Sequence, residues 1–426
     1  MNISENLLFF IWQNRLLSSL NLVGMQGEQI RVIHPGMLNT NAGPDFTEAN
    51  LLIGNTRWAG NIEIHVKSSD WVMHRHQQNP AYDTVILHVV YEHDQIILNS
   101  SGNAIPTLIL KGLFDEALIG RYNELLISNR KFPCSAQIKE IDSFTIRSFL
   151  SRLVVERLEL KSNEVLAKLA DTKGDWNETF YYFLARNFGF KVNAPAFELL
   201  AGSLSHQILA KHADNQQQME ALLFGQAGFL SLQTNNGYPG DLLGEYDFLK
   251  HKYALKPIEV SVWKFLRMRP MNFPTIRIAQ LAALLFNTKF LFSKVMETND
   301  LKQLAKLFEL LPVNSYWTTH YHFRKETKEM RIQLGTRSIE NIMINTACVF
   351  LFSYGKFTDN YALVERSLNF LEQIHQESNS LLTPYTEAGV LIDSAFMSQA
   401  VLQLNKFYCS QKKCLNCGIG VKILRR

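Results

Sequence analysis

The sequence predicts an α+β protein in three parts: a small mixed α/β head, a large all-helical body and a short cysteine-rich tail. Three observations lead to this prediction. Apolar and polar residues alternate in short runs before about residue 110, which is typical of strands. After residue 142 the apolar residues recur at helical spacing. Three of the five cysteines fall between positions 409 and 417. We expect the head at 1–128, a linker at 129–141, the helical domain at 142–405 and the tail at 406–426.

The head begins with a helix expected at 3–18, where apolar residues such as Leu7, Leu8 and Ile11 lie near helical spacing. Strands are expected at 49–53 and 56–58, on either side of Gly54 and Asn55, which form a two-residue hairpin signal. The second strand continues through 61–67, and a β-branched run at 84–91 predicts a buried strand. Further strands are expected at 95–98 and 107–110.

The body contains apolar periodicity that predicts a succession of helices. Asp175 is expected to cap one of them, Gly189 to end it, and Pro195 to lie in the first turn of the next. The expected helices are 144–169, 177–187, 196–204, 216–230, 242–252, 260–267, 276–285, 301–310, 339–354, 362–376 and 395–407.

Composition limits the classes of function. Hydrophobic residues make up 46% and charged residues 19%, which is ordinary for a packed soluble protein. No apolar run approaches the roughly 18 residues that span a bilayer, and the chain does not begin with a basic leader, so we expect a cytoplasmic protein without membrane contact. The net charge of +4 is too small to indicate a nucleic-acid-binding protein by itself. Oligomeric state cannot be predicted from these data.

A pair of carboxylates in the head is the first candidate site. Asp45 precedes the hairpin, and Glu63, His65 and Lys67 fall on one face of the second strand because strand side chains alternate. Asp45 and Glu63 would coordinate Mg²⁺ or Mn²⁺ through hard oxygen ligands, and His65 or Lys67 would orient the attacking water or stabilise the leaving oxygen. The alternative is that these charged residues simply lie on the solvated face of a half-buried sheet.

These residues resemble the PD…(D/E)xK pattern of restriction-endonuclease-like nucleases. Pro44 and Asp45 stand at the PD positions and Glu63 at the acidic position, within a similar order of helix, hairpin and buried strand. The final position departs from the pattern, because His65 replaces the lysine and Lys67 lies one strand repeat further on. The resemblance implies metal-dependent cleavage of phosphodiesters in DNA or RNA.

Histidines offer a second reading of the same region. Five of the twelve histidines are His65, His74, His76, His88 and His93. His74 and His76 would bind Zn²⁺, Fe²⁺ or Mn²⁺ together with His65 or Glu63. The alternative is that each histidine satisfies a local hydrogen bond.

Cysteines form a third candidate site. Cys409, Cys414 and Cys417 have spacing suited to Zn²⁺ or to an iron–sulfur cluster, and Cys134 would supply the fourth ligand. An early cysteine with three late ones also resembles the ligand layout of iron–sulfur-bearing nucleases of the PD-(D/E)xK class, although the spacing differs. The alternative is a group of reduced thiols without metal.

Basic residues suggest where a nucleic acid would bind. Arg267, Arg269 and Arg277 surround a proline-interrupted loop that opens a helix and would cradle phosphates. Lys412 and Lys413 belong to a tail that carries no acidic residue from position 406 onward. The alternative for the arginines is a helix junction in which they pair with buried acids.

Motifs along nearly the whole chain resemble an uncharacterised bacterial domain-of-unknown-function family. They are Gly43–Phe46, Gly60–His65, Asp70-Trp71, His74–His76, Arg269–Pro274 and the cysteine tail. This family resemblance implies no substrate. The leading hypothesis is therefore a metal-dependent nuclease. The alternatives are a non-catalytic adaptor that binds nucleic acid or protein, and a histidine-ligated metalloenzyme acting on a small molecule.

Overall fold

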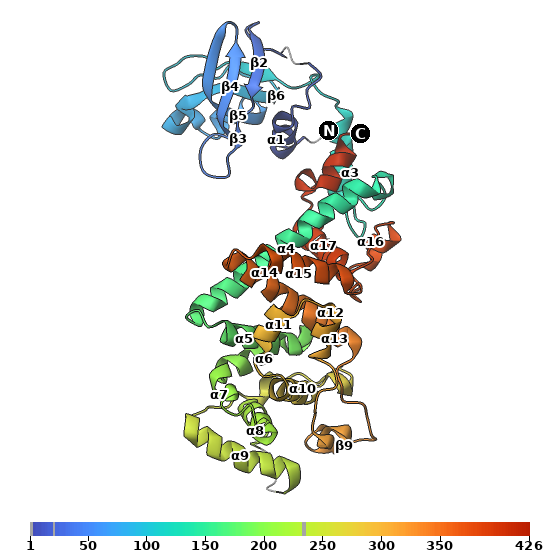
Figure 1. The fold of residues 1–426 in the computed structure, drawn as a ribbon. Coiled ribbons are helices and arrows are strands. Elements are labelled where there is room, and N and C mark those ends of the chain that lie inside the picture. The colour runs from blue at the N-terminus through green and yellow to red at the C-terminus, as the bar shows by residue number, and fades with distance from the viewer. Residues whose placement is uncertain (1–2, 20–21, 232–235) are drawn as a thin grey trace. The chain divides into compact units, whose positions relative to one another are not determined.

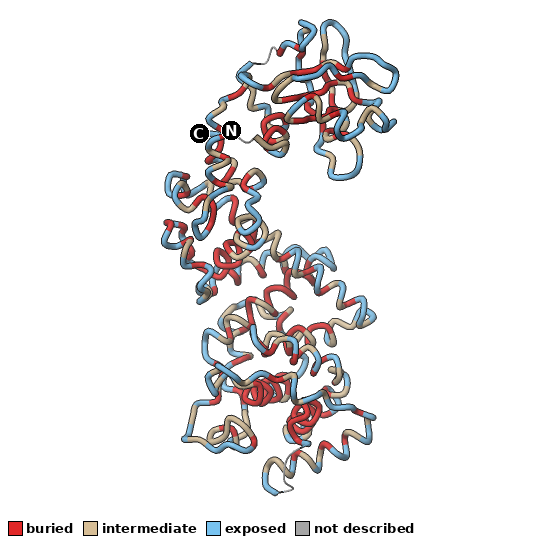
Figure 2. Tube along the Cα trace, turned by 180° about the vertical axis from the view of Figure 1, so that it is seen from behind, coloured by how far each residue is buried: buried red, intermediate tan, exposed pale blue. Residues whose placement is uncertain are grey.

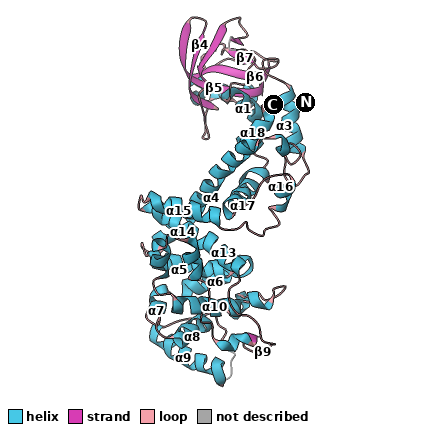
Figure 3. Ribbon diagram, turned by 45° about the vertical axis from the view of Figure 1, so that its right-hand side comes forward, coloured by secondary structure: helices cyan, strands magenta, loops and turns pink. Residues whose placement is uncertain are grey.

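The computed structural model describes residues 3–19, 22–231 and 236–426. The chain forms two compact units. Unit 1 comprises residues 1–149, 387–390 and 405–426, and unit 2 comprises residues 150–386 and 391–404. Unit 1 contains the β-sheet and unit 2 is mainly helical (Figure 3), so the predicted α+β class with a sheet-rich head and a helical body is confirmed.

A seven-stranded mixed sheet forms the centre of unit 1 (Figure 1). Its order is β1-β2-β4-β5-β6-β7, and β3 pairs with β4. The pairs from β1 to β5 are antiparallel, whereas β5, β6 and β7 run parallel to one another. The strands are β1 (Leu22–Val23), β2 (Gln29–His34), β3 (Met37–Leu38), β4 (Phe46–Ile53), β5 (Thr56–Lys67), β6 (Val85–Glu92) and β7 (Thr107–Ile109).

The hairpin between β4 and β5 has the predicted turn. Gly54 adopts a φ of 58°, a left-handed conformation that glycine enters without the steric cost of a Cβ. The register pairs Ile53 with Thr56, so the turn contains only Gly54 and Asn55. β5 then continues to Lys67 and crosses from the antiparallel to the parallel half of the sheet.

Helix α1 (Glu5–Gln13) packs against β5 and buries its apolar side chains completely or nearly so. Trp12 is among them, and its indole Nε1 donates a hydrogen bond to the Pro35 carbonyl at 2.9 Å. Burying this face fixes the helix on the sheet, because burial of each large apolar side chain is worth about 1.5–3 kcal/mol.

The C-terminal segment returns to unit 1. Helix α18 (Gly418–Leu424) lies beside α3 (Ala117–Ile127), as Figure 1 shows, and Arg121 donates to the Leu424 carbonyl at 3.1 Å. Gly418 lies so close to Phe149 that a Cβ there would stand 2.7 Å from its ring. Residues 405–426 are therefore packed with the head, although the sequence suggested a separate tail.

Unit 2 is built from helices that follow the long α4 (Ser143–Asp171). Buried positions run through the middle of this unit (Figure 2), and α10 is buried over most of its length. Neighbouring helices pack in pairs such as α5 with α6, α8 with α9, and α14 with α15. The helices are α5 (Trp176–Phe188), α6 (Phe190–Ser203), α7 (His206–Ala210), α8 (Gln216–Gln226), α9 (Gly237–Tyr253), α10 (Pro274–Asn287), α11 (Leu291–Glu297), α12 (Leu301–Lys306), α13 (Thr336–Ile342), α14 (Cys348–Phe357), α15 (Tyr361–Gln373), α16 (Thr383–Glu387) and α17 (Ala395–Leu404).

Two local predictions for the body were wrong. Pro195 lies inside α6, because that helix begins five residues earlier, directly after Gly189. The helix expected at 260–267 is only a 3-10 turn at Val260–Val262. Trp263 donates from its indole to the Ala227 carbonyl, and the Lys264 amide donates to the Asn193 side chain, so these tertiary bonds replace helical ones.

Two local predictions for the head were also incomplete. Residues 95–98 form no strand, and only Leu98 bridges to Ala104. The prediction omitted α3, the strand β2 and the short strands β1 and β3. In the part of the chain that the structure describes, no helix is long and apolar enough to cross a bilayer.

Candidate metal centre

Two hydrogen bonds between backbone amides and carboxylates link the segments that carry Asp45 and Glu63. The Asp45 amide donates to Glu63 Oε2 at 3.0 Å, and the Ile64 amide donates to Asp45 Oδ2 at 2.9 Å. Both bonds form because β4 and β5 pair in register, with Phe46 opposite Ile62. The two residues are therefore neighbours, and each carboxylate accepts a hydrogen bond from a backbone amide. Glu63 is only 4% exposed, so its second oxygen, Oε1, faces other protein groups rather than bulk water.

His65 and His88 lie side by side on β5 and β6. The parallel register places His88 opposite Glu63, and His65 Nδ1 lies 2.8 Å from His88 Nε2. Both side chains are almost completely buried. One of the two nitrogens carries the shared proton, so His88 orients the His65 ring and directs its Nε2 toward the other side of the site.

His74 and His76 reach the site from the segment after β5. The short helix α2 (Asp70–Met73) ends at His74, Arg75 adopts a left-handed φ of 61°, and a 3-10 turn begins at His76. This reversal brings His74 Nδ1 to 3.2 Å from His65 Nε2. Asp94 anchors the start of the segment by accepting hydrogen bonds from Ser68 and Ser69.

Three imidazoles and one carboxylate therefore converge. Ligand atoms of His65, His74 and His76 all lie within 4.8 Å of one another. Glu63 Oε1 lies 3.1 Å from His76 Nε2 and 3.5 Å from His65 Nε2. Around tetrahedral Zn²⁺, with Zn–N bonds of about 2.0–2.1 Å, neighbouring ligand atoms are about 3.3 Å apart. His65 Nε2 and His74 Nδ1, which are 3.2 Å apart, lie near that spacing, so the three imidazoles could hold a single cation with Glu63 beside it.

Aromatic side chains form the wall of the site. Tyr82 stacks on His76 with ring centroids 3.8 Å apart, and Trp71, which is fully buried, packs edge-on against His76. The ring nitrogen Nε2 of His76 is buried and has no hydrogen-bond partner, although it contacts Glu63. A buried polar atom without a partner is costly, and a metal ion would satisfy it.

Electrostatics favours the forms of these side chains that bind metal. Burial, followed by the neighbouring His88, His76 and His74, lowers the pKa of His65 far below its usual range. Burial likewise lowers the pKa of His88 to about 3. Both rings are neutral near pH 7, as a metal-ligating imidazole must be. Asp45 is the exception: burial, together with the Glu63 charge, raises its pKa to about 8, which favours the protonated form and opposes its predicted role as a metal ligand.

Lys67 is not brought to the centre. Its side chain is exposed, its backbone amide donates to Asp70 Oδ2, and its charge acts on Glu92. His88 contacts His65 and Tyr82 contacts His76, and the sequence alone had assigned neither His88 nor Tyr82 to a site. The density of histidines between positions 65 and 93 was the available signal for His88, but only strand register reveals which of them meet.

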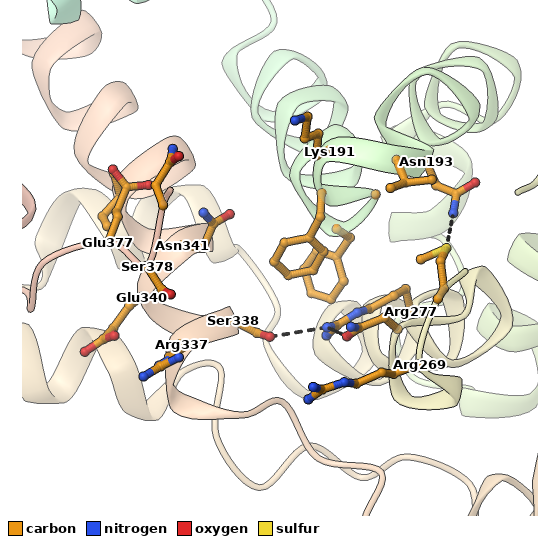
Figure 4. A pocket seen from close by; sticks show the side chains of 18 of the residues that line it. Lys191, Asn193, Arg269, Arg277, Arg337, Ser338, Glu340, Asn341, Glu377 and Ser378 are labelled. Atoms are coloured by element: carbon orange, nitrogen blue, oxygen red, sulfur yellow. Dashed lines mark hydrogen bonds between the residues drawn. The ribbon is translucent and has the colours of Figure 1, made fainter. Parts of the chain in front are cut away.

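Arg267, Arg269 and Arg277 line one cavity of about 600 Å³ in unit 2. Figure 4 shows Arg277 and Arg269 on one side, with Ser338 and Arg337 adjacent. Arg277 is 5% exposed, stacks on Phe190 and donates to Asn272, Gln280 and Ser338, so its partners are neutral groups and not the buried acids of the helix-junction alternative. Its Nε atom is nevertheless buried without a hydrogen-bond partner.

The cysteines and tail lysines come together elsewhere in unit 1. Cys134, Cys409, Cys414 and Cys417 line one small cavity, and Lys413 lies at its edge. The Lys412 ammonium donates to the Leu126 carbonyl. This bond holds the tail against the end of α3.

A family model matches residues 5–380 of the chain. The chain belongs to the family described as "Protein of unknown function (DUF2851)". The matched range includes the histidine–glutamate centre, the arginine-lined cavity and Cys134, and it ends before Cys409. The resemblance drawn from the GPDF, GNIEIH and RPMNFP motifs is thereby confirmed at the level of the family. No curated protein and no solved structure matches the chain.

Proposed function

We propose that the protein is a metal-dependent hydrolase that cleaves phosphodiesters, with its ion held by His65, His74 and His76. The observation that carries the proposal is the convergence of three imidazoles on the Glu63 carboxylate. Imidazole ligands suit Zn²⁺, Mn²⁺ and Fe²⁺ better than Mg²⁺. We therefore revise the expected ion: Mn²⁺ or Zn²⁺ fits this donor set, whereas two carboxylates alone would favour Mg²⁺.

Three protein ligands leave one position for water on a tetrahedral ion. A bound cation lowers the pKa of that water and stabilises the charge that develops on the phosphoryl oxygens. Glu63 Oε1, in contact with His65 and His76, is placed to accept the proton of the water. Asp45 fixes the position of Glu63 through the paired backbone hydrogen bonds.

Two features support a phosphodiester as the substrate. The succession of α1, the β4–β5 hairpin, the short connection with α2 and the buried strand β6 is the order on which the nuclease resemblance was based. His74 and Arg75 are exposed, so the segment that supplies His74 also carries a cation that would meet a phosphate.

The test measures hydrolysis of single- and double-stranded DNA and RNA, and of bis(p-nitrophenyl) phosphate, with Mn²⁺ or Zn²⁺. Glu63→Gln should lower the rate at least 100-fold while the protein stays folded. Glu124→Gln, an exposed change on α3, is the matched control and should be neutral. Equal rates for the wild type and Glu63→Gln would contradict the assignment. Turnover of the small phosphodiester alone would favour the small-molecule alternative.

A second candidate function is anion binding by unit 2, and one observation favours it. The arginine-lined cavity presents Lys191, Arg267, Arg269 and Arg337 together with the unpartnered Nε of the buried Arg277. A phosphate group would satisfy this atom and neutralise the exposed cations. Binding of a fluorescent oligonucleotide should weaken in Arg269→Ala/Arg337→Ala, and the salt dependence should fall by about two charges.

The control for this binding test is Arg331→Ala, an exposed arginine that does not line the cavity. If both variants bind with the same affinity and salt dependence, the cavity does not bind nucleic acid. If inorganic pyrophosphate binds and the oligonucleotide does not, the cavity is a site for a small anion.

A further inference from the structure

The four cysteines that line one cavity in unit 1 come from two distant parts of the chain. Cys134 lies in the turns between α3 and α4. Cys409 ends a π turn at Asn405–Cys409, Cys414 opens a 3-10 turn, and Cys417 caps α18. Pro133, Tyr408, Lys413 and Gly420 complete the lining. The fifth cysteine, Cys348, lies in unit 2 on α14 and has no part in this cluster.

Their burial is unusual for groups that can bind metal. Cys134, Cys414 and Cys417 are 6–7% exposed, and Cys409 is half-buried. Burial raises the pKa of the Cys134 thiol, and the neighbouring Cys409, Cys417 and Cys414 raise it further. Burial and Cys417 likewise raise the pKa of Cys414 to about 11.

The backbone of the tail is folded tightly around these side chains. The Lys413 amide donates to the Tyr408 carbonyl at 3.0 Å, and Lys412 adopts a left-handed φ of 52°. A Cβ at Gly420 would stand 2.3 Å from the Cys414 carbonyl oxygen, so α18 lies directly against the loop that carries Cys414. The loop thus brings Cys409, Cys414 and Cys417 to the cavity that Cys134 also lines.

Apolar packing accounts for one buried cysteine but not for four in one place. Cys348 shows the ordinary case, a single fully buried cysteine within a helical core. Four thiols in one cavity instead match the ligand number of tetrahedral Zn²⁺ and of iron–sulfur clusters.

We infer that Cys134, Cys409, Cys414 and Cys417 form a four-thiolate metal centre that fastens residues 405–426 to the head. The bound group is a thiophilic metal, either one Zn²⁺ or an iron–sulfur cluster. Its role is structural: the four protein ligands leave no open position for water. This inference is independent of the proposed hydrolase, because it involves none of the residues of the histidine centre.

The experiment measures metal content and absorption of the full chain purified without oxygen. It is done in a His76→Ala background, so that metal at the histidine centre does not contribute. We expect either about one Zn per chain and no colour, or iron with a brown absorption band. Cys134→Ser and Cys417→Ser should each lose that metal, and Cys348→Ser, the matched buried cysteine, should keep it.

A second measurement covers the case in which a cysteine variant fails to fold. A strong chelator applied to the otherwise unchanged chain should remove the metal and expose residues 405–426 to limited proteolysis, while the rest of unit 1 is cut more slowly. Metal content that is unaffected by both cysteine changes, or a tail equally protected with and without bound metal, would overturn the inference. Failure of the hydrolase assay leaves these readouts unchanged.

Discussion

His65 Nδ1 and His88 Nε2 lie 2.8 Å apart on adjacent parallel strands, and both rings are buried. This contact determines which nitrogen of His65 faces His74 and Glu63. A buried partner of this kind raises metal affinity without touching the metal, because it fixes the ring and its proton.

Removing the second histidine tests that relationship. His88→Ala should weaken Mn²⁺ or Zn²⁺ binding about 10–100-fold, since it removes a supporting hydrogen bond and not a ligand. Competition with a metal indicator dye measures the affinity. His251→Ala, an exposed histidine on α9, is the control and should bind with wild-type affinity. Unchanged affinity in His88→Ala would remove the supporting role of His88.

Asp45 should matter for stability as well as for the site. Asp45→Ala leaves the Ile64 amide without its acceptor, and an unpaired buried amide costs about 1–3 kcal/mol. Asp45→Asn should retain most of the stability, because its amide oxygen can accept the same hydrogen bond. Urea unfolding compares the two variants. Equal destabilisation by Ala and Asn would show that this hydrogen bond is not the cause.

Lys161 on α4 should make the free energy of unfolding depend on pH. Its ammonium is buried and donates to Asn345 and Gln399. Burial, followed by the Arg157 charge, lowers its pKa to about 7, against the smaller opposing effects of Glu377, Cys348 and Glu164.

An unfolded lysine has a pKa of about 10.4, so between these two values the unfolded chain binds a proton that the folded chain does not. Stability should therefore rise with pH in that window, by up to about 1.4 kcal/mol per pH unit from this group. Chemical unfolding at about pH 8 and about pH 9.5 measures the slope, and Lys161→Met should reduce it. Lys302→Met, exposed on α12, is the control. An undiminished slope in Lys161→Met would exclude Lys161 as the source.

Two glycines should respond in opposite ways to replacement by alanine: Gly54, in the hairpin between β4 and β5, and Gly120, on α3. Gly54→Ala places a Cβ in a left-handed conformation and should destabilise the protein by about 1–2 kcal/mol. Gly120→Ala, on the exposed face of α3 with no atom near its new Cβ, should stabilise by about 0.5–1 kcal/mol. Thermal unfolding of both variants measures the difference. A gain in stability for Gly54→Ala would contradict the turn geometry.

Local signals in the sequence account for much of the fold. The Gly54-Asn55 turn, the shared face of Glu63 and His65 on β5 and the N-terminal cap of α5 at Asp175 were predicted correctly, whereas burial along β5 does not alternate at residues 62–65. These features depend on short-range physics: backbone conformation, side-chain alternation and capping hydrogen bonds. The short edge strands β1 and β3 have only two residues each and carry no such signal.

The sequence by itself determined that Glu63 and His65 share a face of one strand and that three cysteines lie close together near the C-terminal end. Only the tertiary structure decided which distant groups join them. β6 brings His88 to His65, the reversal at Arg75 brings back His74 and His76, and Lys67 remains outside. The physical reason is that strand register and chain reversal set distances between residues far apart in sequence, whereas periodicity reports only on neighbours.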